Sequence, residues 1–135
     1  MTNKGFTLLE LLAIIVLLAV IAIITVPVVI GVIDDARKKA FTDSAYNLVK
    51  AAQTYQTVNG GDIEVKINYT NGNPSLDIGK FKGDLPDSGT FILDSSGKSE
   101  MKIWRDDLKV CAVKEKNSKK IEISETITTK EACKL

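Results

Sequence analysis

One carboxylate inside a long apolar segment is the group in this chain that most needs a chemical partner. Glu10 lies near the start of a run that continues to Ile33 without another charged side chain, and residues 11–24 include no polar side chain at all. About 20 apolar residues suffice to span a bilayer. A charge at the centre of such a helix costs about 2.5–3.5 kcal/mol, and less near its end. We therefore expect Glu10 to form an ion pair with a cation.

The element that must hold this carboxylate is a helix over residues 6–33. The run is too long for a strand and too apolar for a surface helix, so it is expected to lie in a lipid bilayer or between other helices. Pro27 has no amide hydrogen and Gly31 weakens the next turn, which predicts a kink, with Thr25 satisfying a freed carbonyl. Two interpretations of Pro27 stay open: a compliant joint, or a kink that membrane helices tolerate.

Two simpler explanations of the N-terminus are a secretory signal peptide and a plain signal anchor. A secretory signal peptide has an apolar core of about 7–15 residues followed by a small-residue cleavage site, and the core here is longer. A plain signal anchor fits the length, but it predicts that Glu10 can be replaced by leucine without loss of function.

The helical pattern is expected to continue beyond the apolar run as an amphipathic segment over residues 34–58. The charged residues 34–39 indicate where the chain leaves the bilayer. An apolar stripe then recurs at intervals of three and four residues, which predicts one face resting on a folded head. The stripe consists of Phe41, Ala45, Leu48, Ala52 and Tyr55. The segment Asn59-Gly60-Gly61 is suited to end the helix.

Residues 59–135 predict a small, β-rich head. Apolar and polar residues alternate over 63–69, followed by a turn at 70–74 and a loop over 79–89. Short connections predict antiparallel pairing. The expected strands are 63–69, a brief return at 76–78, then 90–93, 101–105, 108–114 and 120–124. The predicted fold class is α+β: a long N-terminal helix packed on a small antiparallel sheet.

The N-terminal segment resembles a known processing signal. Gly-Phe-Thr-Leu-Leu-Glu-Leu at residues 5–11, entered from a short basic leader, is similar to the signal of type IV pilins and pseudopilins. The match is close as far as Ile33, and beyond it only the layout is similar. The resemblance implies that residues 1–5 form a cytoplasmic leader cut after Gly5 by a prepilin peptidase, which also N-methylates Phe6. It makes Glu10 the assembly carboxylate and Pro27 the helix proline.

The resemblance also implies a mechanical function and a set of partners. The new amine of Phe6 would pair with Glu10, either within one chain, where four residues span roughly 6 Å along a helix, or between staggered neighbours in a filament. The partners would be further copies of the chain, related minor pilins, a membrane platform protein and an assembly ATPase. The chain would be stored in the cytoplasmic membrane and then exported as a surface filament. Main pilin, minor pilin, secretion pseudopilin and competence pseudopilin all remain open.

Orientation in the membrane is set by the resemblance alone. Lys4 competes with Arg37, Lys38 and Lys39 across the apolar run, so the positive-inside rule gives no clear answer. The family layout implies a cytoplasmic leader and a head outside.

Two cysteines, Cys111 and Cys133, could supply a staple that a head of this size needs. A disulfide between them would close a loop and hold the C-terminal end of the chain in place. The alternative is that both cysteines are reduced thiols. In family terms the bridge resembles the C-terminal disulfide of many pilins. Metal ligation is not expected, because the chain has no histidine.

Catalysis and cofactor binding are not expected. The chain lacks histidine, a glycine-rich phosphate loop and a nucleophile elbow. Adjacent carboxylates at Asp34-Asp35 and Asp106-Asp107 are interpreted as solvated boundary charges. The rival to the pilin hypothesis is a single-pass, membrane-tethered binding module that does not polymerise.

Nucleic acid is a weak candidate partner. Eighteen basic and seventeen acidic residues nearly cancel, and the one cationic cluster is residues 114–120. These lysines could contact DNA phosphates. Glu115 dilutes them, however, and no aromatic residue is interleaved for stacking, which favours a solvated hairpin tip.

Overall fold

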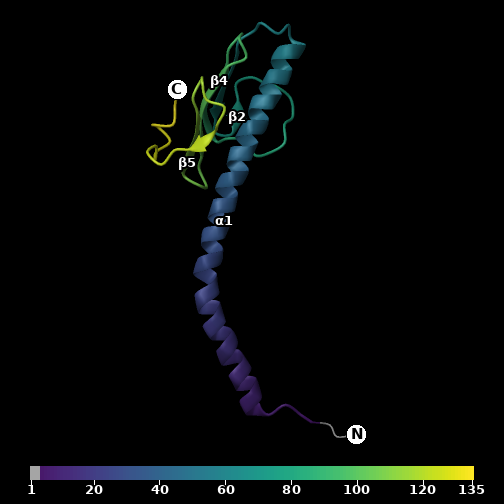
Figure 1. Cartoon of the computed structure of the whole chain (residues 1–135), viewed down its shortest axis with the longest axis vertical. Coiled ribbons are helices and arrows are strands. Elements are labelled where there is room, and N and C mark those ends of the chain that lie inside the picture. The colour runs from purple at the N-terminus through teal and green to yellow at the C-terminus, as the bar shows by residue number, and fades with distance from the viewer. Residues whose placement is uncertain (1–3) are drawn as a thin grey trace. The chain divides into compact units, whose positions relative to one another are not determined.

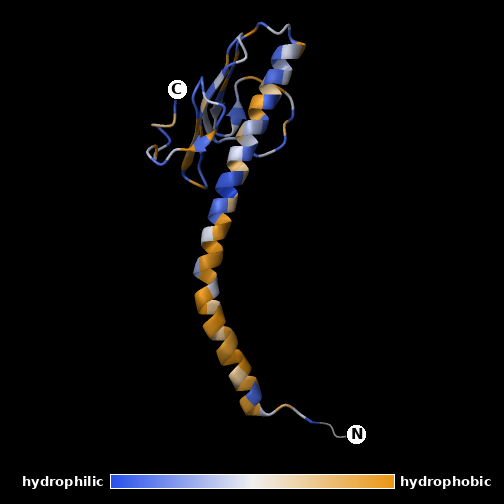
Figure 2. Ribbon diagram, in the orientation of Figure 1, coloured by the Kyte–Doolittle hydropathy of each residue, from blue (hydrophilic) through white to orange (hydrophobic). Residues whose placement is uncertain are grey.

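The computed structural model describes residues 4–135, which form two compact units with their boundary at Asp35 and Ala36. Met1–Asn3 of the expected leader lie outside the described residues. Helix α1, Leu8–Val58, runs through both units. Its hydropathy changes near this boundary from mostly hydrophobic to mixed (Figure 2).

The part of α1 after Ala36 buries one face against the sheet (Figure 1). The expected stripe is confirmed at Phe41, Ala45, Leu48 and Ala52, which are at most 3% exposed, and Tyr55 is partly buried. The helix ends at the predicted glycines: the Gly61 amide donates to the Gln56 carbonyl at 2.8 Å. Gly60 has φ +115° there, so the cap depends on glycine.

Polar side chains on the same helix hold loops of the head. The Gln56 amide donates to the carbonyls of Ile63 at 2.6 Å and Asp94 at 2.8 Å. Ser44 Oγ accepts from the amide of Asp84 at 3.1 Å. Helical periodicity does not predict these contacts, because every partner lies outside the helix, and Asp84 and Asp94 lie about forty positions along the chain.

The sheet is six-stranded and antiparallel, with the order β2-β1-β3-β4-β5-β6. The strands are β1 Val65–Thr70, β2 Asn73–Pro74, β3 Ser88–Leu93, β4 Ser99–Arg105, β5 Val110–Lys114 and β6 Glu122–Ile123. The α+β class and the antiparallel pairing are therefore confirmed. Val65, Ile67, Phe91, Leu93, Met101 and Ile103 form the core with the helix stripe.

Several strand limits differ from those expected. The predicted return at 76–78 is wrong: β2 is Asn73–Pro74, because Asn71 and Gly72 adopt positive φ and close a tight hairpin. Leu76 and Ile78 instead pack against the core as partly buried loop residues.

Strand ends elsewhere shift by one or two residues. β3 and β4 each begin two residues before the expected start, because Ser88 pairs with Trp104 and Ser99 with Leu93. β5 begins at Val110 rather than Leu108, since Lys109 has φ +51° and turns the chain. β1 begins at Val65, and β6 is only Glu122–Ile123.

Gly89 allows β3 and β4 to approach closely, and its replacement should be severe. A Cβ added there would overlap the Lys102 carbonyl oxygen and lie 2.6 Å from Ile103 Cα, on a backbone with φ +125°. We expect Gly89→Ala to destabilise the head by about 3 kcal/mol or more, measured by thermal unfolding. Gly97→Ala is the control: φ is +81° but nothing lies within 4 Å, so about 1 kcal/mol is expected. Equal losses in the two variants would contradict the close-approach explanation.

Candidate functional site

The first turn of α1 contains a capping box that positions Glu10. Thr7 is the N-cap: its carbonyl accepts the first helical bond, from Leu11, at 3.2 Å. Its hydroxyl accepts from the Glu10 amide at 3.2 Å, and Glu10 Oε2 accepts from the Thr7 amide at 2.9 Å and hydroxyl at 3.0 Å. Sequence analysis missed this arrangement, although Thr-x-x-Glu before an apolar run is its signature.

The capping box leaves Glu10 able to act on a second partner. Both hydrogen bonds to its carboxylate use Oε2, and within residues 4–135 Oε1 receives none. Both donors belong to Thr7, whereas Phe6 is 85% exposed. Gly5 lies before the helix in a segment without regular secondary structure, and a Cβ added there would meet nothing within 4 Å. The site therefore offers a fixed carboxylate beside an accessible backbone segment.

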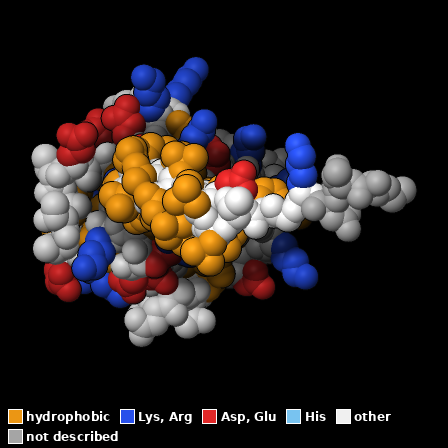
Figure 3. All heavy atoms as spheres, turned by 90° about the horizontal axis from the view of Figure 1, so that it is seen from below, with side chains coloured by type: hydrophobic (Ala, Val, Ile, Leu, Met, Phe, Trp, Pro, Cys, Tyr) orange, Lys and Arg blue, Asp and Glu red, His pale blue; other side chains and the backbone are white. Residues whose placement is uncertain are grey.

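The helical residues after Glu10 present apolar side chains that no other part of residues 4–135 buries. The large hydrophobic residues from Leu8 to Ile33 are 45–86% exposed, and they form the hydrophobic cluster seen in Figure 3. α1 is long and apolar enough to cross a membrane, and its most apolar stretch is not buried within residues 4–135. Such a surface requires lipid or other apolar helices around it.

The predicted kink residues lie within an uninterrupted helix. Pro27 and Gly31 are both helical in α1. The Thr25 hydroxyl donates to the Ile21 carbonyl at 2.8 Å. The carbonyl that lacks a helical partner because of Pro27 is that of Ile23, so the expected rescue by Thr25 is wrong: the hydroxyl bonds the carbonyl four residues before itself.

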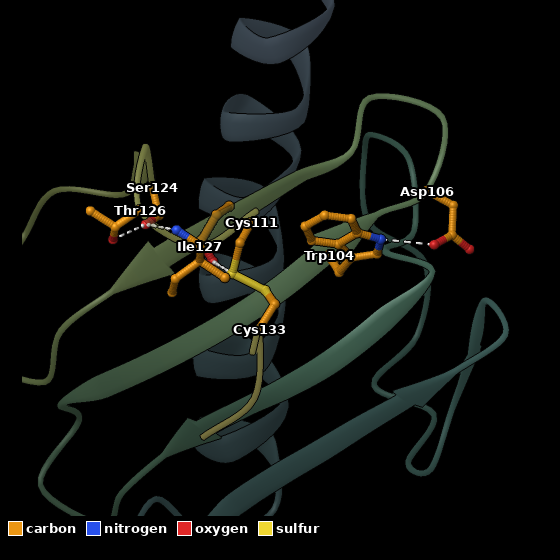
Figure 4. The surroundings of a disulfide bond; sticks show 8 residues. Trp104, Asp106, Cys111, Ser124, Thr126, Ile127 and Cys133 are labelled. Carbon is orange, nitrogen blue, oxygen red and sulfur yellow. Dashed lines mark hydrogen bonds between the residues drawn. A yellow bond between two sulfur atoms is a disulfide. The ribbon is translucent and has the colours of Figure 1, made fainter. Parts of the chain in front are cut away.

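Cys111 and Cys133 lie at disulfide distance, with their Cα atoms 5.8 Å apart. Both are completely buried, and with Trp104 they form a second apolar cluster that Val113 and Ile127 complete (Figure 4). The Ile127 amide donates to Ser124 Oγ at 3.1 Å, which fixes the chain beside the bridge. The cysteines thereby hold the C-terminal segment against the outer face of β4 and β5.

Asp106 and Asp107 are not merely solvated boundary charges, which corrects the expectation from sequence. Asp106 accepts from the Trp104 indole at 2.8 Å and from the Lys130 ammonium at 3.2 Å. Asp107 accepts from the Arg105 guanidinium at 2.8 Å, and this hydrogen bond lowers the pKa of the Asp107 carboxyl. The pair therefore supports the head and the C-terminal segment.

Within residues 4–135, no three histidine, cysteine, aspartate or glutamate side chains are placed to hold one metal ion. Comparison with protein-family models, with curated proteins and with solved structures finds no match to this chain.

Proposed function

We propose that this chain is a structural subunit of a filament of the type IV pilus or pseudopilus kind, stored as a single-pass membrane protein before assembly. The observation that carries the proposal is the combination of a bare apolar helix surface with one fixed carboxylate at its start. Lipid can cover the apolar surface of a stored subunit, and neighbouring helices can cover it in a filament.

In this proposal Glu10 sets the stagger between neighbours. Cleavage after Gly5 gives Phe6 a charged amine, and the Phe6 of one subunit meets the Glu10 of the next. Taking two charges out of water costs several kcal/mol each, so the ion pair contributes register and orientation more than net strength. Packing of the apolar helices supplies the larger part of the assembly energy. The capping hydrogen bonds from Thr7 hold the carboxylate in place without neutralising its charge.

The processing step gives the direct test of this proposal. We expect mass spectrometry of sheared surface material to find the chain beginning at methylated Phe6. Gly5→Leu, which places a bulky side chain at the cleaved bond, is expected to leave full-length chain in the membrane and to reduce filament yield below detection. Gly31→Ala, at a helical glycine with open space around it, should be processed normally. Retention of an intact N-terminus in wild-type material would contradict the proposal.

A membrane-tethered binding module is the second candidate. Residues 36–135 form a compact unit of their own. This unit has a groove lined by Lys50, Lys98, Lys114, Lys116 and Lys119, which suits a binding role. A tethered binder would stay monomeric and keep its activity in Gly5→Leu. Loss of filaments in that variant separates the two functions.

A further inference from the structure

A groove with a cationic rim lies between α1 and two loops of the head. One wall is α1 at Tyr46, Val49, Lys50 and Gln53; the others are the β3–β4 turn and the loop after β5. Its volume is about 600 Å³ and its surface is mostly apolar. The lining contains five lysines and no carboxylate. These lysines are Lys50, Lys98, Lys114, Lys116 and Lys119.

The loop that carries several of these lysines is held in place. The Ile121 amide donates to the Tyr46 hydroxyl oxygen at 2.9 Å, which ties the end of the loop to α1. At its start, the buried Lys114 ammonium donates to the Ser99 carbonyl at 2.6 Å. The Ser118 amide donates to the Glu115 carbonyl at 3.0 Å and closes a turn between them. The cationic rim is therefore preorganised.

The charges of the five lysines are not equally available. Lys116 pairs with Asp94 at 2.9 Å, which raises the pKa of Lys116, and burial lowers the pKa of Lys114. Lys50, Lys98 and Lys119 are exposed and have no ion pair within residues 4–135. These three supply the free positive charge of the groove.

Two features of the sequence disfavoured nucleic-acid binding: the acidic Glu115 within the lysine run and the lack of an aromatic residue among the lysines. The folded structure changes both. Glu115, which dilutes the lysine run in sequence, lines a different hollow on the β6 side. The missing aromatic residue comes from α1, since Tyr46 lines the same groove as Lys116 and Lys119. Proximity in space, rather than in sequence, brings the aromatic ring to the cations.

We propose that this groove binds single-stranded nucleic acid, with Lys50, Lys98 and Lys119 contacting the phosphodiester backbone and Tyr46 contacting a base. Single-strand sites combine a cationic groove with aromatic residues on which bases stack. All five cations in the lining are lysines and none is arginine. The groove therefore lacks the bidentate geometry with which arginine recognises carboxylates. The expected binding is therefore electrostatic and tolerant of sequence.

The test measures the affinity of the full chain for a labelled thymidine oligonucleotide by fluorescence anisotropy. The chain is kept in nonionic detergent, because the test needs no filament. Three phosphate contacts predict a slope of log affinity against log salt of about −2, since single strands give about −0.7 per contact. The triple variant K50Q/K98Q/K119Q should weaken binding by about tenfold or more at low salt and flatten that slope. K66Q/K80Q/K82Q, an equal charge change at exposed lysines outside the groove, should change affinity by less than about twofold.

Two Tyr46 variants separate stacking from loop support. Tyr46→Leu should weaken binding by roughly fivefold or more, whereas Tyr46→Phe, which loses only the hydroxyl partner of Ile121, should bind nearly as wild type. Equal losses in the two lysine variants would overturn the proposal. So would tighter binding of polyglutamate, or of inorganic polyphosphate with no effect of Tyr46→Leu. Because monomers are measured, failure here leaves the filament proposal untouched.

Discussion

Replacing Glu10 with glutamine is expected to abolish filament formation while leaving processed chain in the membrane. Glutamine keeps the size of the side chain and can take the same place in a capping box, so the helix start is preserved. Only the negative charge is lost. Removing one partner from a desolvated ion pair costs about 3–5 kcal/mol, and each 1.4 kcal/mol is about tenfold. Filament yield, measured in sheared material, should therefore fall by roughly a hundredfold or more.

This substitution distinguishes two roles of Glu10. If the carboxylate serves only to cap α1 through Thr7, Glu10→Gln should assemble as wild type and Thr7→Val should be the more damaging change. If the charge sets the stagger, Thr7→Val should retain most assembly, because helix capping contributes only about 1 kcal/mol. Thr7→Ser, which keeps the hydroxyl, is the matched control. Normal filaments from Glu10→Gln would refute the ion-pair hypothesis.

Removing the Cys111–Cys133 bridge is expected to destabilise the head by about 3 kcal/mol. The cysteines are 22 positions apart, and closing a loop of that length in the unfolded chain corresponds to about 3 kcal/mol in the chain-entropy model. The bridge also buries the cluster around Trp104. A double alanine variant should therefore unfold at lower urea concentration and expose its C-terminal segment.

The chain contains a single tryptophan, and it lies beside the bridge. Urea unfolding followed by Trp104 fluorescence, in detergent, measures the loss directly. Limited trypsin digestion at Lys130 and Lys134 reports release of the C-terminal segment. A reducing agent should reproduce both effects in the wild type and have no further effect on the double variant. An unchanged urea midpoint after reduction would show that packing alone holds the segment.

Local patterns were sufficient to predict α1 and its cap. The apolar run, the stripe of threes and fours and the two glycines after Asn59 each act within a few residues, so the helix bounds matched closely. Alternation likewise placed Val65, Ile67 and Tyr69 on the buried face of β1. The strand predicted at 76–78 was wrong because the backbone conformation at Asn71 and Gly72, rather than hydrophobicity, decides which residues pair with β1.

The candidate sites divide in the same way. Residue types alone reveal the apolar segment, the position of Glu10 within it and the two cysteines. Three further contacts depend on how the head folds: Cys111 meets Cys133, Asp106 pairs with Lys130, and Tyr46 lies beside lysines more than fifty positions away. Helical and strand periodicity reflect interactions between residues close together in the sequence. The contacts named above join residues far apart in the sequence, so they depend on the strand order and on the loops that fold over α1.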